Sequence, residues 1–280
     1  METNGSPNAV PGAAAAITQL ACQIEALRDN LDWTLAHFVF VAAATALSEE
    51  CDIVCSPAMS VVSYHGPRFP ELAFWGESPE LLRTYTTFLV EPGSEVHLLV
   101  SMEQRAIVEQ AFAVIEIRPS WQLVFAGEAQ HLDPGTATPL KPRHLAAMQA
   151  LAQKAEISTV GEELFERGPA MGIWEGRTLV AMGVTRTRVP GVVEIGKIAV
   201  HPDYRQRGYT ANIVAALLQS LFEEETSLTV FTMVQQGNTE ALQRYEALGF
   251  ERARPMYLIR CLVADEQAPA TGGGAFTESR

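Results

Sequence analysis

The order of apolar patterns in residues 141–261 constrains the fold more than any other feature of this 280-residue chain. Two segments with helical spacing come first, then three strand-like segments separated by turns at Glu175-Gly176 and Pro190-Gly191, then helix, strand, helix and strand patterns. These segments are 141–155, 160–167, 171–175, 177–189, 191–200, 208–224, 227–234, 238–249 and 251–261. Three consecutive strands predict an antiparallel meander, and the later strand–helix–strand order predicts a parallel crossover. We therefore expect a mixed α/β sheet.

Prolines and glycines interrupt the periodicity between residues 131 and 142 and divide the chain into two blocks. We expect an N-terminal α/β domain over 13–135 and a second domain over 136–263. The two ends, 1–12 and 264–280, are rich in Pro, Gly, Ala and Ser and are predicted to be disordered tails. In the front block, helices are expected over 14–47, 78–89 and 102–112, with Ser78 as the N-cap of the second. Strands are expected over 60–65, 71–75 and 96–101, and two short strands within 114–125.

The formal net charge of −13 comes from the front of the chain, where residues 1–139 hold 5 Lys and Arg against 17 Asp and Glu. An acidic surface repels phosphate backbones, so nucleic acid is a poor partner and a cationic amine a plausible one. The alternative is that this charge only keeps the protein soluble.

The composition also bears on location and metals. The N-terminus lacks the basic segment of a secretory signal. The most apolar stretch, 33–47, is shorter than the roughly 20 residues of a bilayer span. We therefore expect a cytoplasmic protein without membrane contact. Four cysteines without a neighbouring His cluster predict no metal site.

A strand pattern ends at Val200, and a long helix pattern begins near Gly208. The first N–H groups of such a helix have no partner within it and lie at the positive end of its dipole, so they can hold a phosphate. Gly208 permits close approach of the anion, and Arg205 and Arg207 add positive charge. This turn alone is consistent with either an anion-binding cradle or an ordinary loop.

A second motif reads N-x-x-A-x-x-x-Y-x-x-x-G-F and comprises Asn238, Ala241, Tyr245, Gly249 and Phe250. Asn238 is predicted to cap a helix that Gly249 ends. The first three residues share one helix face. Taken alone, Tyr245 could be either a core residue or a catalytic one.

Together the two motifs, within residues 138–261, resemble the GNAT superfamily of acyl-CoA N-acyltransferases, and the chain looks like a bacterial subgroup with an extra N-terminal domain. In that family the pattern [Q/R]-x-x-G-x-[G/A] binds the pyrophosphate of CoA; Thr210 stands here in place of the final Gly or Ala. The resemblance implies acetyl-CoA as acyl donor, without a metal. The residues it implies for binding are Ile198, Ala199, Val200, Arg205, Gln206, Arg207, Gly208, Tyr209, Thr210 and Asn238.

The resemblance further implies direct attack of an amine on the thioester. Glu194 lies 11 residues before Arg205, the offset at which some family members place a general base. Its apolar neighbours predict a raised pKa. The alternative is a carboxylate paired with Arg186, Arg188 or Lys197.

Three further roles follow from the resemblance. The main-chain N–H of Ile198 would stabilise the oxyanion, and Val200 would pair with the pantetheine arm of CoA. Tyr245 would protonate the departing thiolate. Asn238 would contact CoA or only cap its helix.

The strand–helix–strand order of residues 96–117 mimics that of 227–261, which suggests that the front domain is a degenerate GNAT-like domain. Its acidic surface could line an amine-binding cleft or form a homodimer. We expect an N-acetyltransferase acting on a primary amine of a small molecule. The alternatives are a non-catalytic acyl-CoA-binding regulatory protein and an N-acyltransferase that uses longer acyl chains.

Overall fold

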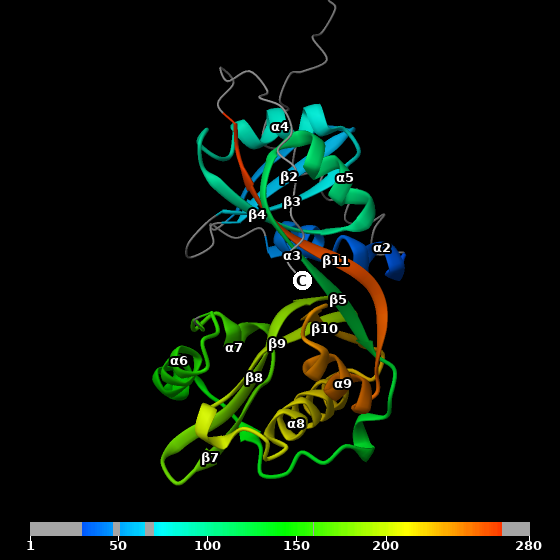
Figure 1. The fold of residues 1–280 in the computed structure, drawn as a ribbon. Coiled ribbons are helices and arrows are strands. Elements are labelled where there is room, and N and C mark those ends of the chain that lie inside the picture. Colours follow the sequence, from blue (N-terminus) through cyan, green and yellow to red (C-terminus); the bar gives the residue numbers. More distant parts are fainter. Residues whose placement is uncertain (1–29, 47–50, 65–69, 159, 265–280) are drawn as a thin grey trace, which may run out of the picture. The chain divides into compact units, whose positions relative to one another are not determined.

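A computed structural model describes residues 30–46, 51–64, 70–158 and 160–264 (Figure 1). The helices are α2 (Leu31–Ala36), α3 (Phe38–Ala46), α4 (Pro79–Thr87), α5 (Met102–Ala111), α6 (Leu145–Lys154), α7 (Leu164–Arg167), α8 (Tyr209–Glu224) and α9 (Thr239–Ala247). Short 3-10 turns are η1 (Ala129–His131), η2 (Pro142–His144) and η3 (Pro202–Tyr204).

The strands are β1 (Cys51–Cys55), β2 (Met59–Tyr64), β3 (Glu71–Gly76), β4 (Glu95–Ser101), β5 (Ala113–Phe125), β6 (Thr138–Pro139), β7 (Ala170–Glu175), β8 (Thr178–Val189), β9 (Val192–Val200), β10 (Thr229–Gln235) and β11 (Phe250–Leu262). In the described part of the chain they are hydrogen-bonded in the order β1-β2-β3-β4-β11-β5-β10-β9-β8-β7-β6. β7, β8 and β9 form the predicted antiparallel meander, and β10 runs parallel to β9. The mixed α/β architecture is confirmed.

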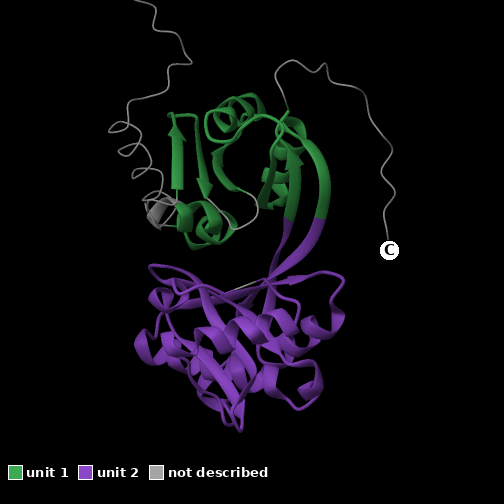
Figure 2. Cartoon of the chain, turned by 90° about the vertical axis from the view of Figure 1, so that its left-hand side faces the viewer, with its two compact units in different colours: residues 1–117, 258–280 green, residues 118–257 purple. Residues whose placement is uncertain are grey.

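The chain forms two compact units (Figure 2). Unit 1 comprises Met1–Ile117 and Leu258–Arg280, and unit 2 comprises Arg118–Tyr257. These boundaries differ from those expected from the sequence, 13–135 and 136–263. The reason is that the second half of β5 pairs with β10 and so belongs to the later sheet, while the end of β11 belongs to unit 1.

Some of the sequence expectations lie outside the described residues. They are the tails 1–12 and 265–280 and most of the first half of the helix expected over 14–47. Strand β1 was not expected, and the two short strands expected within 114–125 form the single strand β5.

In unit 1, β1, β2 and β3 are antiparallel, and β4 lies parallel to β3. The predicted cap of α4 is confirmed, since the Ser78 hydroxyl accepts from the N–H of Leu81. Ser101 and Gln104 form a reciprocal capping box at the start of α5.

In unit 2, helices cover both faces of the sheet. The apolar side chains of α8 and α9 form one core cluster, and those of α6 and α7 form another. β8 and β9 contribute to both, because successive strand residues face opposite sides. The first cluster includes Val193, Ile195, Ile213, Leu217, Leu221 and Leu242; the second includes Met148, Leu151, Leu164, Met182 and Val184.

Candidate active site

In unit 2, the parallel strands β9 and β10 pair over only part of their length. Their ladder joins Val192, Val193 and Glu194 to Thr229, Val230 and Phe231, and in the described residues it ends there. β9 nevertheless continues to Val200, and β10 to Gln235. The backbone groups that face each other beyond Glu194 are therefore available to an extended ligand, which can pair as an added strand.

A β-bulge lies on β9 just beyond this point. Gly196 pairs with Val184 and Ala199 with Met182, so Lys197 and Ile198 together oppose Gly183. Lys197 has φ +51°, which is uncommon for a residue with a side chain. A Cβ on Gly183 would lie 2.5 Å from Ile198 Cδ1, so glycine is needed opposite the bulge. Ile198, the expected oxyanion donor, thus lies at an irregular position on the diverging strand.

The predicted phosphate cradle joins β9 to α8. Gln206 and Gly208 have φ of +64° and +80°, and the 16-residue helix α8 begins directly after them at Tyr209. The N–H groups of its first turn have no partner within the helix. A Cβ on Gly208 would have nothing within 4 Å, so there is space for an anion beside the helix terminus. These residues fit a diphosphate.

Two side chains of the cradle have partners within unit 2. The Arg207 guanidinium lies 4.8 Å from the centre of the Tyr204 ring. The Tyr209 hydroxyl donates to Glu175 Oε1 at 2.6 Å, and this hydrogen bond raises the pKa of Tyr209. Tyr209 is therefore held at the first position of α8, while Thr210 beside it is half-buried.

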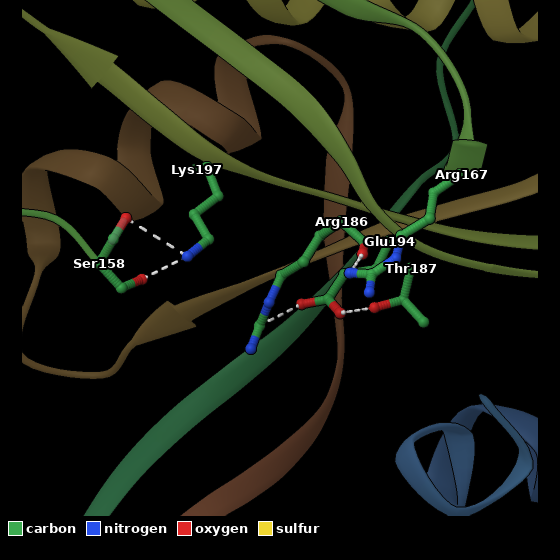
Figure 3. Close-up of polar contacts among 6 residues, drawn as sticks. All are labelled: Ser158, Arg167, Arg186, Thr187, Glu194 and Lys197. Atoms are coloured by element: carbon green, nitrogen blue, oxygen red, sulfur yellow. Dashed lines mark hydrogen bonds and ion pairs between the residues drawn. The ribbon is translucent and has the colours of Figure 1, made fainter. Parts of the chain in front are cut away.

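Glu194 is the last residue of β9 that pairs with β10, and it is 4% exposed. Its Oε1 accepts from Arg186 Nη1 at 2.8 Å, and its Oε2 from the Thr187 hydroxyl at 3.5 Å (Figure 3). The apolar neighbours of Glu194 in the sequence suggested an apolar environment. In the structure, Arg186 and Thr187 also contact the carboxylate. Of the three cations considered for it, Arg186 is the partner. Arg188 pairs with carboxylates at the end of α8, and Lys197 donates to the loop after α6.

Tyr245 lies on α9 and packs in the core of unit 2, with its ring edge-on to Phe250 at 5.2 Å. Burial raises the pKa of Tyr245 to about 12, and its hydroxyl is hydrogen-bonded to the side chain of Thr232 on β10. At neutral pH the phenol is therefore protonated, as a proton donor must be. Thr232 directly follows Phe231, where β10 leaves β9. As one of two threonines in a mainly apolar strand, it gave no signal in the sequence.

Asn238 caps α9, as predicted, because its Oδ1 accepts from the N–H of Ala241 at 3.1 Å. Gly249, with φ +92°, follows the end of α9. The two motifs therefore form the local structures expected of them: a cradle before α8, and a capped helix after β10.

The described ranges contain neither a metal-binding cluster nor a helix that could span a membrane. No three His, Cys, Asp or Glu side chains gather there as a metal site would require. No described helix combines the length and the apolar character needed to cross a bilayer.

Known proteins resemble this chain both in sequence and in fold. The family model of FR47-like proteins matches residues 170–259, which include the meander, the cradle and the capped helix. The chain is also similar in structure to a GNAT-family protein from Novosphingobium aromaticivorans (TM-score 0.59, 20% identity, 71% of this chain and 87% of that one). Unit 2 thus has the fold of GNAT proteins, and residues 170–259 within it match the FR47-like family model.

Two further structures resemble nearly the whole chain. One is a GCN5-related N-acetyltransferase from Sphaerobacter thermophilus, with a TM-score of 0.61, 14% identity and coverage of 94% of this chain and 97% of that one. The other is a tandem GNAT protein from the clavulanic acid biosynthesis pathway, with a TM-score of 0.60, 11% identity and coverage of 91% and 97%. At these identities the likeness concerns the fold. It agrees with the expectation of a GNAT-like front domain. No protein of curated function matches the chain in sequence.

Proposed function

We propose that the GNAT domain transfers an acetyl group from acetyl-CoA to the primary amine of a small molecule. The fold supports acyl transfer in general. The observation that carries the proposal is the succession of three features along β9: its separation from β10, the bulge at Lys197 and Ile198, and the left-handed cradle before α8. Together they offer an open strand edge that leads to a phosphate site.

Acetyl-CoA, when bound, supplies an activated acyl thioester. The cradle from Arg205 to Thr210 would hold its diphosphate through main-chain N–H groups and Arg side chains. The edge of β9 at Ala199 and Val200 would pair with the pantetheine arm. Asn238 would lie near the CoA but acts first as the cap of α9.

Three groups of the protein would then move protons or stabilise the charge that forms during acyl transfer. Glu194 would accept the proton of the attacking ammonium, directly or through water. The N–H of Ile198, at the bulge, would donate to the carbonyl oxygen as it gains negative charge. Tyr245, whose phenol is protonated at neutral pH, would give its proton to the thiolate.

The first experiment measures acetyl-CoA binding by isothermal titration to the wild type, Gly208→Glu and Gly191→Glu. Gly191 is a matched control, since it too has a positive φ (+75°) and nothing within 4 Å of an added Cβ, but it lies at the other end of β9. Loss of binding in Gly208→Glu alone is the expected result. Equal binding by all three proteins would remove the cradle from the proposal.

The second experiment follows thiol release with a panel of amines and with acetyl- and longer acyl-CoAs. Turnover with acetyl-CoA is expected. Binding without turnover on any amine would indicate a non-catalytic acyl-CoA-binding protein. Preference for a longer chain would reassign the acyl donor.

A further inference from the structure

The strands β3 and β4 of unit 1 separate in the same way as β9 and β10 of unit 2. In the described residues, their parallel ladder ends where Leu72 pairs with Leu98. β3 nevertheless continues to Gly76, and β4 to Ser101. In both units one helix joins the two strands and another follows the second strand: α4 and α5 in unit 1, α8 and α9 in unit 2. Unit 1 therefore contains a second opening between parallel strands.

The side chain of Gln104, on α5, bridges this opening. Its Oε1 accepts from the N–H of Ser101, the last residue of β4, at 3.2 Å. Its Nε2 donates to the carbonyl oxygen of Phe74, beyond the paired part of β3, at 3.0 Å. Gln104 is 6% exposed. A buried carboxamide thus bonds to both strands, as the amide of an inserted extended ligand would.

Helix capping accounts for only one of these bonds. Ser101 and Gln104 form the capping box of α5, in which Oε1 bonds to the N–H of the cap residue, and a glutamate would serve equally there. The bond from Nε2 to Phe74 lies outside the box. Nε2 also donates to His37 Nδ1 at 3.0 Å, so both of its hydrogens have acceptors. The amide nitrogen is therefore held by contacts that a carboxylate could not make.

The corresponding position in unit 2 carries a small side chain. Gln104 is the third residue after Ser101, the cap of α5, and Ala241 is the third after Asn238, the cap of α9. Because both helices follow the second strand of an opening, the two positions correspond. The methyl group of Ala241 is too short to bridge two strands. One opening is therefore filled by the chain itself, and the other is not filled from this position.

The turn from β3 to α4 is unlike the cradle before α8. The first turn of α4 carries Glu80, whose Oε2 accepts from Ser78 Oγ at 3.1 Å, and a carboxylate there repels a phosphate. A Cβ on Gly76 would lie 2.6 Å from the carbonyl oxygen of Ala58, whereas one on Gly208 would have nothing within 4 Å. The start of α4 thus offers neither the space nor the charge for a diphosphate.

We propose that the opening between β3 and β4 is a second amide-binding slot, which Gln104 fills from within, so that unit 1 takes no acyl-CoA and each chain binds one molecule. The slot itself stands on the contacts of unit 1 alone. The count of one rests on the proposed function, because it requires the opening in unit 2 to take acetyl-CoA.

Scanning calorimetry of the full-length protein at neutral pH tests the slot. Gln104→Glu keeps the oxygen that the capping box needs but places a second acceptor against the carbonyl of Phe74. Like Gln104→Ala, it is expected to lower Tm by about 5–15 °C, because buried polar groups lose their partners. Gln110→Glu, the matched control, makes the same change at an exposed position of α5 and should move Tm by less than about 2 °C. A Gln104→Glu protein as stable as the wild type would refute the bridge.

A free carboxamide provides the second measurement. Acetamide is expected to raise the Tm of Gln104→Ala by about 2–5 °C relative to its effect on the wild type, since it can occupy the emptied slot. An equal effect on the two proteins would mean that the opening does not accept amides.

Calorimetric titration with acetyl-CoA tests the count, including where the Gln104 variants do not fold. The wild type is expected to show one site per chain, and Gly208→Glu none. Ala241→Gln, which gives unit 2 the bridging residue of unit 1, should weaken binding about tenfold or more. Its control is Glu240→Gln at the neighbouring exposed position.

The outcomes separate this inference from the proposed function. Two sites per chain, the second surviving in Gly208→Glu, would overturn the inference. Undiminished binding by Ala241→Gln would overturn the correspondence between the two openings. No binding by the wild type would refute the proposed function, while the scanning calorimetry still decides whether Gln104 fills a slot.

Discussion

Replacing Gly208 with alanine is expected to lower the free energy of unfolding of unit 2 by about 1–2 kcal/mol. Gly208 has φ +80°, and a residue with a Cβ costs about that much in the left-handed region. An added Cβ would meet nothing within 4 Å, so no steric clash contributes. Gly237 provides the control, because it is equally open but its φ is not positive. Gly237→Ala is expected to stabilise the fold by about 0.4–1 kcal/mol through the unfolded chain.

A third variant adds a clash to the strain. Gly249 has φ +92°, and its added Cβ would lie 3.1 Å from the Cα of Gly127. Forcing backbone apart costs about 1–3 kcal/mol beyond the strain, so Gly249→Ala is expected to be the least stable of the three.

Urea unfolding followed by tryptophan fluorescence measures the series, since unit 2 contains Trp121 and Trp174. From most to least stable, the expected order is Gly237→Ala, wild type, Gly208→Ala and Gly249→Ala. Each kcal/mol also moves Tm by about 3–6 °C for a domain of this size. A Gly208→Ala protein as stable as the wild type would refute the left-handed cradle before α8.

The remaining predictions concern buried groups. Tyr245→Phe is expected to lower kcat with unchanged acetyl-CoA affinity, measured by thiol release and calorimetry; full activity would mean that another group protonates the thiolate. Since burial raises the pKa of Tyr245 to about 12, the folded state holds the proton more tightly than the unfolded one, so stability should fall by up to roughly 3 kcal/mol between about pH 10 and pH 12. That fall should shrink in Tyr245→Phe in urea titrations at pH 9 and pH 11.5, and an identical fall would contradict the assignment. Burial also raises the pKa of Cys55 and Cys261, so iodoacetamide at pH 8 should label Cys51 well before either of them in peptide maps.

Much of the fold of unit 2 could be predicted because its elements carry local signals. β7, β8 and β9 are runs of mostly buried residues separated by turns, and α8 has the periodicity of a helix with one buried face. The caps are local too, which is why Ser78 and Asn238 were placed correctly. Strand β1 lacked such a signal, because it is only five residues long and only its last two residues are buried.

The division into units depended on pairing between distant segments. Pro119 interrupts the apolar run of 114–125, so the sequence suggested two short strands. In the structure β5 continues through it: the Pro119 carbonyl accepts from the N–H of Gln236, and Pro119 has no N–H that would be left unpaired. The boundary between units falls within this strand, and no local composition marks it.

The motifs located the candidate site in the sequence. The sequence could not predict which charged group contacts Glu194. Val189 and Val192 pair next to the turn, and an unbroken hairpin from there places Thr187 opposite Glu194, on the same face. By alternation, Arg186 and Arg188 then belong to the other face, which would leave Glu194 without either. The structure retains the Thr187–Glu194 pair and brings Arg186 to the carboxylate only because a bulge at Arg186 adds one residue to β8. A bulge depends on packing across the sheet rather than on the residue that forms it. Whether Glu194 is an isolated base or one half of an ion pair therefore follows from register, which a single sequence does not reveal.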